Sequence, residues 1–142
     1  MPTESDVERY GFAFDHRFAR WLSILGIRPD TCHLTLAPAG LHVRFGPWTV
    51  RTPLDNVAGA ETTGPYAAWK VIGPHLSLAD RGLTFGTSTA QGVCVRFHTP
   101  VTGLDPLRLL HHPGLTVTVA DPATVARRLN SIATAAGWTP AG

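Results

Sequence analysis

Histidine side chains carry the most suggestive chemistry in this 142-residue chain. His111 and His112 are adjacent, and His98 precedes the same proline-rich segment. Neighbouring residues of an extended segment point to opposite sides, so the adjacent pair cannot readily bind one metal ion together. One of the two could still join His98 or His75 as a ligand to a metal or a haem. We expect instead that these histidines contact solvent or a backbone carbonyl, and the sequence predicts no cofactor.

The sequence motifs of common enzyme classes are missing. There is no Gly-x-Ser-x-Gly elbow, no Gly-rich phosphate loop ending in Lys-Ser/Thr, no dinucleotide fingerprint and no His-Glu-x-x-His. The carboxylates are scattered through turns and helix starts, and no two of them share a strand face. This pattern favours a protein that is not an enzyme. A weaker alternative is a ligand-binding enzyme built around His98, His111 and Asp105.

Arginine dominates the positive charge, because only one of the twelve basic residues is a lysine. Arg44, Arg51 and Arg96 occupy the polar positions of alternating segments, and we expect them to project outward. If their strands adjoin, they form a basic stripe that could meet a phosphate or a partner carboxylate. The formal net charge of only +2 argues against nucleic acid as the partner.

Two aromatic residues form a second candidate partner site. Tyr66 and Trp69 lie in a segment of poor strand character that follows Gly64-Pro65. A large aromatic side chain in such a segment can remain exposed and act as an anchor for a protein partner. We therefore predict Tyr66 and Trp69 as contact residues, together with the three arginines.

The elements that position these residues can be predicted from apolar spacing. Apolar residues three and four apart indicate a helix over 15–25, and Asp121-Pro122 begins a second helix that runs to 136. Apolar and polar residues alternate elsewhere, as they do in half-buried strands. Strands are expected at 31–37, 41–45, 48–51, 57–62, 69–72, 75–78, 83–86, 93–98 and 115–119.

Short strands separated by frequent turns are typical of an antiparallel meander, and curling the sheet removes its exposed edges. We expect odd-numbered residues of 41–45, 93–97 and 115–119 to share one apolar interior. The predicted fold class is mainly β (α+β): one small bent antiparallel β-barrel or sandwich of about seven strands, with a short N-terminal helix and a capping C-terminal helix. Residues 1–13 are predicted to be a flexible N-terminus and residues 14–137 the domain itself.

Composition excludes several other classes of protein. With 44% apolar and 15% charged residues, the chain can build a core and is not a disordered tail. Cys32 and Cys94 form no Cys-x-x-Cys, so we expect two reduced thiols and no zinc site. No apolar run approaches the roughly 18 residues of a membrane span. The polar N-terminal segment does not match a signal peptide, so a cytoplasmic location is expected.

Two stretches of the sequence resemble bacterial pleckstrin-homology-like domains. The first is Leu41–Phe45 followed by Trp48, Pro53-Leu54 and Val57, and the second is Leu115–Pro122 running into a helix. Residues 82–85, 92–95 and 115–119 are also similar to segments of small actinobacterial proteins. The resemblance spans residues 31–136 and implies a bent barrel of about seven strands with a capping helix.

The sequence also differs from that family in two features. The turn Ala37–Gly40 has no basic residue, whereas phosphoinositide-binding relatives carry Lys or Arg there. The helix expected before the first strand is absent from the minimal domain, so a lipocalin-like or helix-grip barrel remains an alternative fold.

The sequence therefore predicts a non-catalytic binding or scaffolding domain that holds a protein or peptide partner at a sheet edge or a loop face. The alternative is a carrier of a small hydrophobic ligand, with a cavity inside the barrel lined by Phe45, Trp48, Phe85 and Phe97. A homodimer formed through a free edge strand is also possible.

Overall fold

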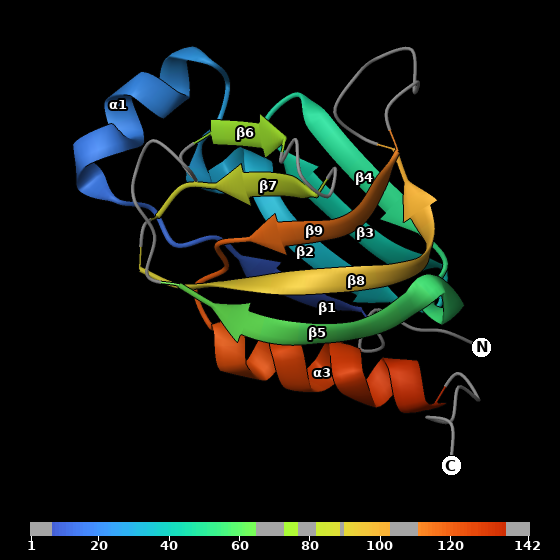
Figure 1. Cartoon of the computed structure of the whole chain (residues 1–142). Coiled ribbons are helices and arrows are strands. Elements are labelled where there is room, and N and C mark those ends of the chain that lie inside the picture. Colours follow the sequence, from blue (N-terminus) through green and yellow to red (C-terminus); the bar gives the residue numbers. More distant parts are fainter. Residues whose placement is uncertain (1–6, 65–72, 77–81, 89, 103–110, 136–142) are drawn as a thin grey trace.

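The computed structural model describes residues 7–64, 73–76, 82–88, 90–102 and 111–135. This part of the chain is mainly β and contains two sheets and two α-helices (Figure 1). The helices are α1 (His16–Ile24) and α3 (Pro122–Ala135), and two short 3-10 turns cover Pro29–Thr31 and Leu54–Asn56. The strands are β1 (Glu8–Gly11), β2 (Cys32–Ala37), β3 (Gly40–Phe45), β4 (Trp48–Thr52), β5 (Val57–Thr63), β6 (Gly73–Leu76), β7 (Leu83–Gly86), β8 (Gly92–Val101) and β9 (His112–Val117).

Strands β2, β3 and β4 of the first sheet form the antiparallel meander that the alternating pattern predicts, and β1 adds a fourth strand that it did not. The strand order of this sheet is β1-β2-β3-β4, with tight turns between β2 and β3 and between β3 and β4. Gly40 begins β3 with φ +144°, and a Cβ atom there would lie 2.6 Å from the carbonyl oxygen of Thr52. Because L side chains rarely adopt that conformation and the space is closed, the hairpin requires glycine at this position.

The second sheet departs from the predicted meander. Its strand order is β5-β8-β9-β7-β6, and β9 runs antiparallel to β8 but parallel to β7. The expectation of a wholly antiparallel fold is therefore wrong for the β7–β9 pair. A half-buried strand shows the same two-residue alternation whichever way its neighbour runs, so this pairing depends on tertiary contacts.

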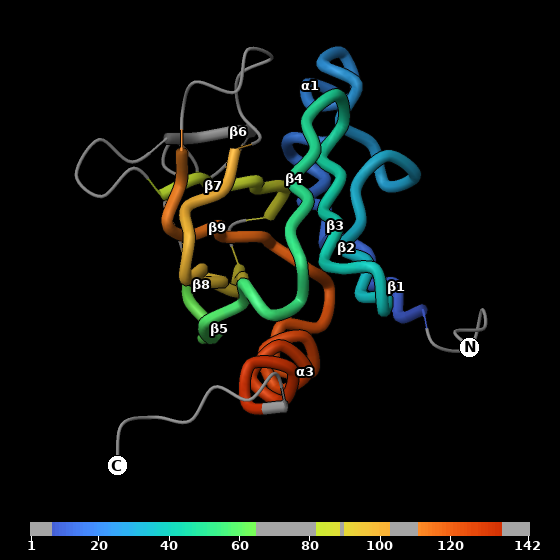
Figure 2. Tube along the Cα trace, turned by 90° about the vertical axis from the view of Figure 1, so that its right-hand side faces the viewer, coloured from blue at the N-terminus to red at the C-terminus, as the bar shows by residue number. Residues whose placement is uncertain are grey.

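The two sheets pack against each other, and the apolar core lies between them (Figures 1 and 2). The prediction of one shared interior is confirmed, since Val43, Val95 and Val117 are fully buried. The Phe45 and Phe85 rings stack at the centre with their centroids 4.7 Å apart. Among the described strands, no backbone pairing joins the two sheets into a closed barrel.

Helix α3 packs on β5 and β8 and lies across one end of the two sheets (Figure 2). Its buried residues, Val125, Ala126, Leu129 and Ala133, face the core, as expected for a capping helix. Asn130 also blocks the open edge of β5: its Oδ1 accepts from the backbone N–H of Ala60 and its Nδ2 donates to the Ala60 carbonyl, both at 2.9 Å. The helix thus satisfies backbone groups that an edge strand leaves unpaired.

The N-terminal segment contains a strand that the alternating pattern did not predict. Residues 1–6 lie outside the described part, but residues 8–11 form β1, and Phe12 is buried. The Arg128 guanidinium donates to both carboxylate oxygens of Glu8, at 2.7 and 2.6 Å. These bonds, with a further one from the Tyr10 hydroxyl, lower the pKa of Glu8 to about 2. Arg128, which lies far along the chain, thus stabilises β1, a strand too short to show a clear alternation of apolar and polar residues.

Helix α1 agrees with its predicted range, but it packs differently. The Asp15 side chain caps it by accepting from the Arg17 backbone N–H at 3.0 Å. Trp21, Leu22 and Leu25 are among the apolar residues whose spacing predicts this helix. Trp21 and Leu25 are 58% and 41% exposed, whereas Leu22 is fully buried. Helix α1 therefore contacts the core with a narrower strip than the spacing suggested.

Candidate functional site

The outer face of the first sheet brings basic and polar side chains from four strands together. Inward residues such as Leu34 and Val43 are fully buried, so their alternating neighbours lie on the face turned away from the second sheet (Figure 2). The cross-strand register forms one row of Arg9, Thr35, His42 and Arg51, and a second row of Gly11, His33, Arg44 and Thr49. We call Arg9, His33, Thr35, His42, Arg44 and Arg51 the basic face.

The three arginines of the basic face are exposed and have no carboxylate partner among the described residues. The ion pairs found in that part of the chain use Arg17, Arg28, Arg96 and Arg128 instead. The Arg44 side chain donates to the carbonyl of Gly46 at 3.3 Å, a contact that leaves its charge uncompensated. The basic face therefore holds a local excess of positive charge, although the net charge of the whole chain is small.

Three polar atoms of the basic face are buried and have no hydrogen-bond partner among the described residues: His33 Nδ1, Thr35 Oγ1 and His42 Nε2. The two imidazole rings meet edge to face, with centroids 6.1 Å apart. An unsatisfied buried polar atom typically costs about 1–3 kcal/mol, so a ligand that supplied the missing bonds would recover part of that energy.

The surroundings of both histidines favour the neutral form. Burial lowers the pKa of His33, and the charges of Arg9 and Arg44 lower it further. Burial also lowers the pKa of His42, with additional effects from Arg51, His33, Arg44 and Arg9. Each neutral ring keeps one N–H donor and one acceptor nitrogen. An anion placed among these groups would raise both pKa values.

A groove of about 600 Å³ lies beside the basic face. Thr35, His42 and Arg51 supply its polar side chains at one end, and most of the rest of its lining is small or apolar. It is lined by Val7, Thr35, Ala37, Ala39, Gly40, Leu41, His42, Arg51, Thr52 and Pro53.

No family model, curated protein or solved structure matches this chain. In the part of the chain that the structure describes, no helix has the length and apolarity needed to cross a membrane.

The predicted stripe of three arginines does not form. Arg44 and Arg51 lie on neighbouring strands of the first sheet, whereas Arg96 lies on β8 of the second sheet. Arg96 Nη1 donates to Glu61 Oε1 at 2.9 Å, so this arginine has a local counter-ion. Because β3 and β8 belong to different sheets, their strands do not adjoin, and the condition for a stripe of all three arginines is not met.

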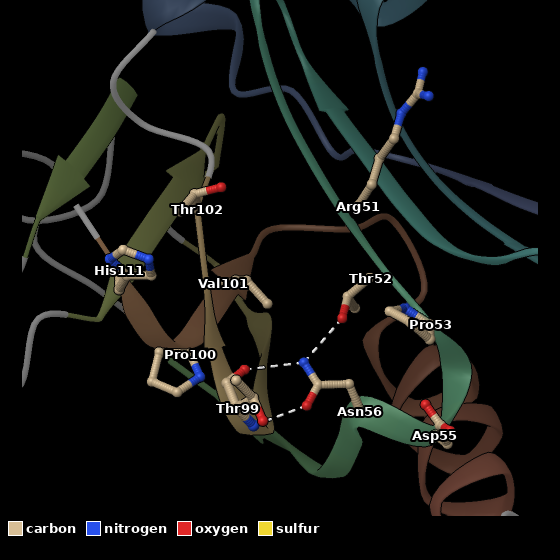
Figure 3. A pocket seen from close by; sticks show the side chains of 10 residues that line it. All are labelled: Arg51, Thr52, Pro53, Asp55, Asn56, Thr99, Pro100, Val101, Thr102 and His111. Carbon is tan, nitrogen blue, oxygen red and sulfur yellow. Dashed lines mark hydrogen bonds between the residues drawn. The ribbon is translucent and has the colours of Figure 1, made fainter. Parts of the chain in front are cut away.

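A second pocket, of about 460 Å³, lies between the end of β4 and the end of β8, with His111 at its side (Figure 3). The Asn56 side chain occupies one wall: it donates to Thr52 Oγ1 at 2.8 Å and to the Thr99 carbonyl at 2.9 Å. It also accepts from the Thr99 backbone N–H at 2.8 Å. Arg51 points away from this clamp. The amide thus ties β4 to β8, so this pocket is a weaker candidate than the basic face.

The histidines singled out for metal binding do not assemble a metal site in the described residues. His98 and His111 are exposed and His112 is buried, and no three His, Cys, Asp or Glu side chains there could hold an ion. Cys32 and Cys94 are both free thiols. Tyr66, Trp69, Asp105 and the side chain of His75 lie outside what the structure describes.

Sequence reasoning missed Arg9, His33 and His42 as site residues. Arg9 fell within the segment predicted to be flexible, and the two histidines appeared only as the polar positions of their strands. The tight turn between β2 and β3 offered a usable signal, because pairing across it places His42 opposite Thr35 and His33 opposite Arg44.

Proposed function

We propose that the chain is a cytoplasmic, non-catalytic binding domain of pleckstrin-homology-like form whose basic face holds a carboxylate-bearing segment of a protein or peptide partner. The observation that carries this proposal is the set of three arginines without ion-pair partners in the described part of the chain. They stand beside polar atoms of His33, Thr35 and His42 that also lack partners there. Carboxylate oxygens accept hydrogen bonds from guanidinium, imidazole and hydroxyl donors alike.

One feature of the fold supports the pleckstrin-like part of the proposal: the C-terminal helix covers one end of the two sheets, as the resemblance implies. The described strands form two sheets and do not close into the barrel that the resemblance also implies. Strand β1, helix α1 and the parallel β7–β9 pair are departures from that form. Because one fold hosts many functions, the site and not the fold supports the binding role.

The packing of the interior favours a binding domain over a hydrophobic-ligand carrier. A carrier needs an internal void, but Phe45 and Phe85 stack on each other and Trp48 contacts Phe45 with centroids 6.3 Å apart. Three of the four side chains expected to line a cavity therefore pack together. Addition of a partner strand to β5 is also disfavoured, because Asn130 already bonds the outer backbone groups of Ala60.

Titration with an acidic peptide tests this function. An eight-residue peptide of alternating Glu and Ser, labelled with fluorescein, is titrated with the domain at low salt and followed by anisotropy. We expect saturable binding that weakens as salt screens the charges. The variant Arg9→Gln/Arg44→Gln/Arg51→Gln should bind at least about tenfold more weakly, since three contacts of about 0.5 kcal/mol are lost.

The matched control is Arg20→Gln/Arg28→Gln/Arg127→Gln, which removes the same charge from exposed positions elsewhere. It should bind the peptide nearly as well as the unmodified domain. Equal weakening in both triple variants would mean that net charge, and not the basic face, attracts the peptide, and absence of saturable binding would remove the proposal.

Peptide binding should strengthen as the pH falls from about 7.5 to about 5.5. The pKa values of His33 and His42 are lowered in the free domain, and a bound carboxylate raises them, so binding takes up protons. The same titration, repeated across this pH range, measures how the peptide affinity depends on pH. The double variant His33→Ala/His42→Ala should weaken this dependence, whereas His16→Ala/His98→Ala, at exposed positions, should not change it. An affinity that falls on acidification would contradict the assigned role of the two rings.

A further inference from the structure

On the outer face of the first sheet, a polar row and an apolar strip lie side by side. The row of Thr35, His42 and Arg51 is polar and basic. Two residues further along the same strands, the same face carries Ala37, Gly40 and, just past β4, Pro53. Residues two apart on a strand are separated by about 7 Å, so an apolar strip runs beside the basic row at that distance.

The hairpin itself keeps space open above the apolar strip. The groove is formed at the turn between β2 and β3, where Ala37 and Ala39 have short side chains and Gly40 has none. Gly40 admits no larger residue because of its φ angle and the Thr52 carbonyl. Val7, which is 43% exposed, closes the groove on the β1 side. An apolar side chain of moderate size would lose its contact with water there.

The boundary between this polar row and the apolar strip determines which ligand chemistry fits. Thr35 Oγ1 and His42 Nε2 lie at this boundary without a hydrogen-bond partner in the described part of the chain, and Arg51 lies beside them. A lone inorganic anion would satisfy these groups but leave the apolar strip in contact with water. A purely apolar ligand would cover the strip but leave the polar atoms unsatisfied. A carboxylate held about 7 Å from an apolar side chain fits both, since this is the spacing of residues i and i+2 in an extended chain.

We propose that the partner segment is an extended peptide in which an acidic residue and a large aliphatic residue lie two positions apart. The carboxylate contacts Thr35, His42 and Arg51, and the aliphatic side chain enters the groove over Ala37 and Gly40. This inference rests on the proposed function, because it defines the sequence that the basic face selects. Specificity then comes from the groove, and the arginines supply most of the salt-dependent attraction.

Three labelled octapeptides of equal charge test the inference. The first repeats Glu-Ser-Leu-Ser, the second Glu-Ser-Ser-Ser, and the third Glu-Leu-Ser-Ser, in which leucine points to the opposite side of an extended chain. By anisotropy, the first should bind about tenfold more tightly than the other two, as expected for partial burial of one leucine. Equal affinities for all three would overturn the inference and leave the proposed function standing. If none binds, the proposed function fails as well.

Filling the groove provides a second, independent readout. Ala37→Phe should remove the advantage of the first peptide over the second, because the added ring fills the groove. Thr84→Phe, on the outer face of the second sheet, is the matched control and should keep the advantage. If the leucine preference persists in Ala37→Phe, the groove is not where leucine binds. The comparison of peptide registers on the unmodified domain does not depend on the folding of either variant.

Discussion

Replacing Leu129 by aspartate is expected to abolish cooperative folding of the domain. The Leu129 side chain is fully buried where α3 covers the core, close to the equally buried Val125. A carboxylate there would lose its hydration, and a buried leucine contact would be lost with it. The combined cost of several kcal/mol is comparable to the total stability of about 5–15 kcal/mol that domains of this size possess.

Circular dichroism during thermal and urea denaturation measures this effect. Ser131→Asp adds the same charge to an exposed position of the same helix and should change the free energy of unfolding by no more than about 0.5 kcal/mol. If Leu129→Asp kept a transition close to that of the unmodified chain, α3 would not seal the core as described.

Replacing Phe85 by alanine is expected to cost about 3–5 kcal/mol of unfolding free energy. The ring is fully buried and lies parallel to Phe45, with only 3° between the two planes. Removing it leaves a cavity that the flanking strands cannot fill, because β7 is held by β6 on one side and β9 on the other. Urea denaturation followed by far-UV circular dichroism gives the value directly.

This variant also separates the binding domain from the carrier. In a hollow barrel Phe85 would line a void, and its removal would cost little because few contacts disappear. Trp21→Ala is a suitable control, since it deletes a larger aromatic side chain that is 58% exposed. A cost below about 1 kcal/mol for Phe85→Ala would revive the carrier hypothesis.

The arrangement of the basic face explains why common sequence motifs did not reveal it. Its residues come from four strands, and each strand contributes only one or two of them. Binding through such a face needs charge and hydrogen-bond donors at suitable spacing, but no nucleophile, metal ligand or glycine-rich loop. A site of this kind has no signature within a single short segment of sequence.

Most individual elements followed from the sequence by itself. Alternation predicted β7 with its observed bounds and predicted the buried residues of β3, β8 and β9, and Asp121-Pro122 marked the start of α3. These features depend on local physics: the side-chain period of a strand or helix, and the preference of Asp and Pro for a helix start. The proximity of Arg44 and Arg51 could also be predicted, because a tight turn joins their strands.

The tertiary structure decided which distant segments meet. It placed β9 between β8 and β7, seated β1 on β2 with the help of Arg128, and separated Arg96 from the other two arginines. It also added Arg9 and the two histidines to the site. Strands with the same alternation can pair in many orders, and the order that forms is the one that buries both sheets' apolar faces and satisfies their edges together. That condition involves the whole chain, so no single segment of the sequence contains it.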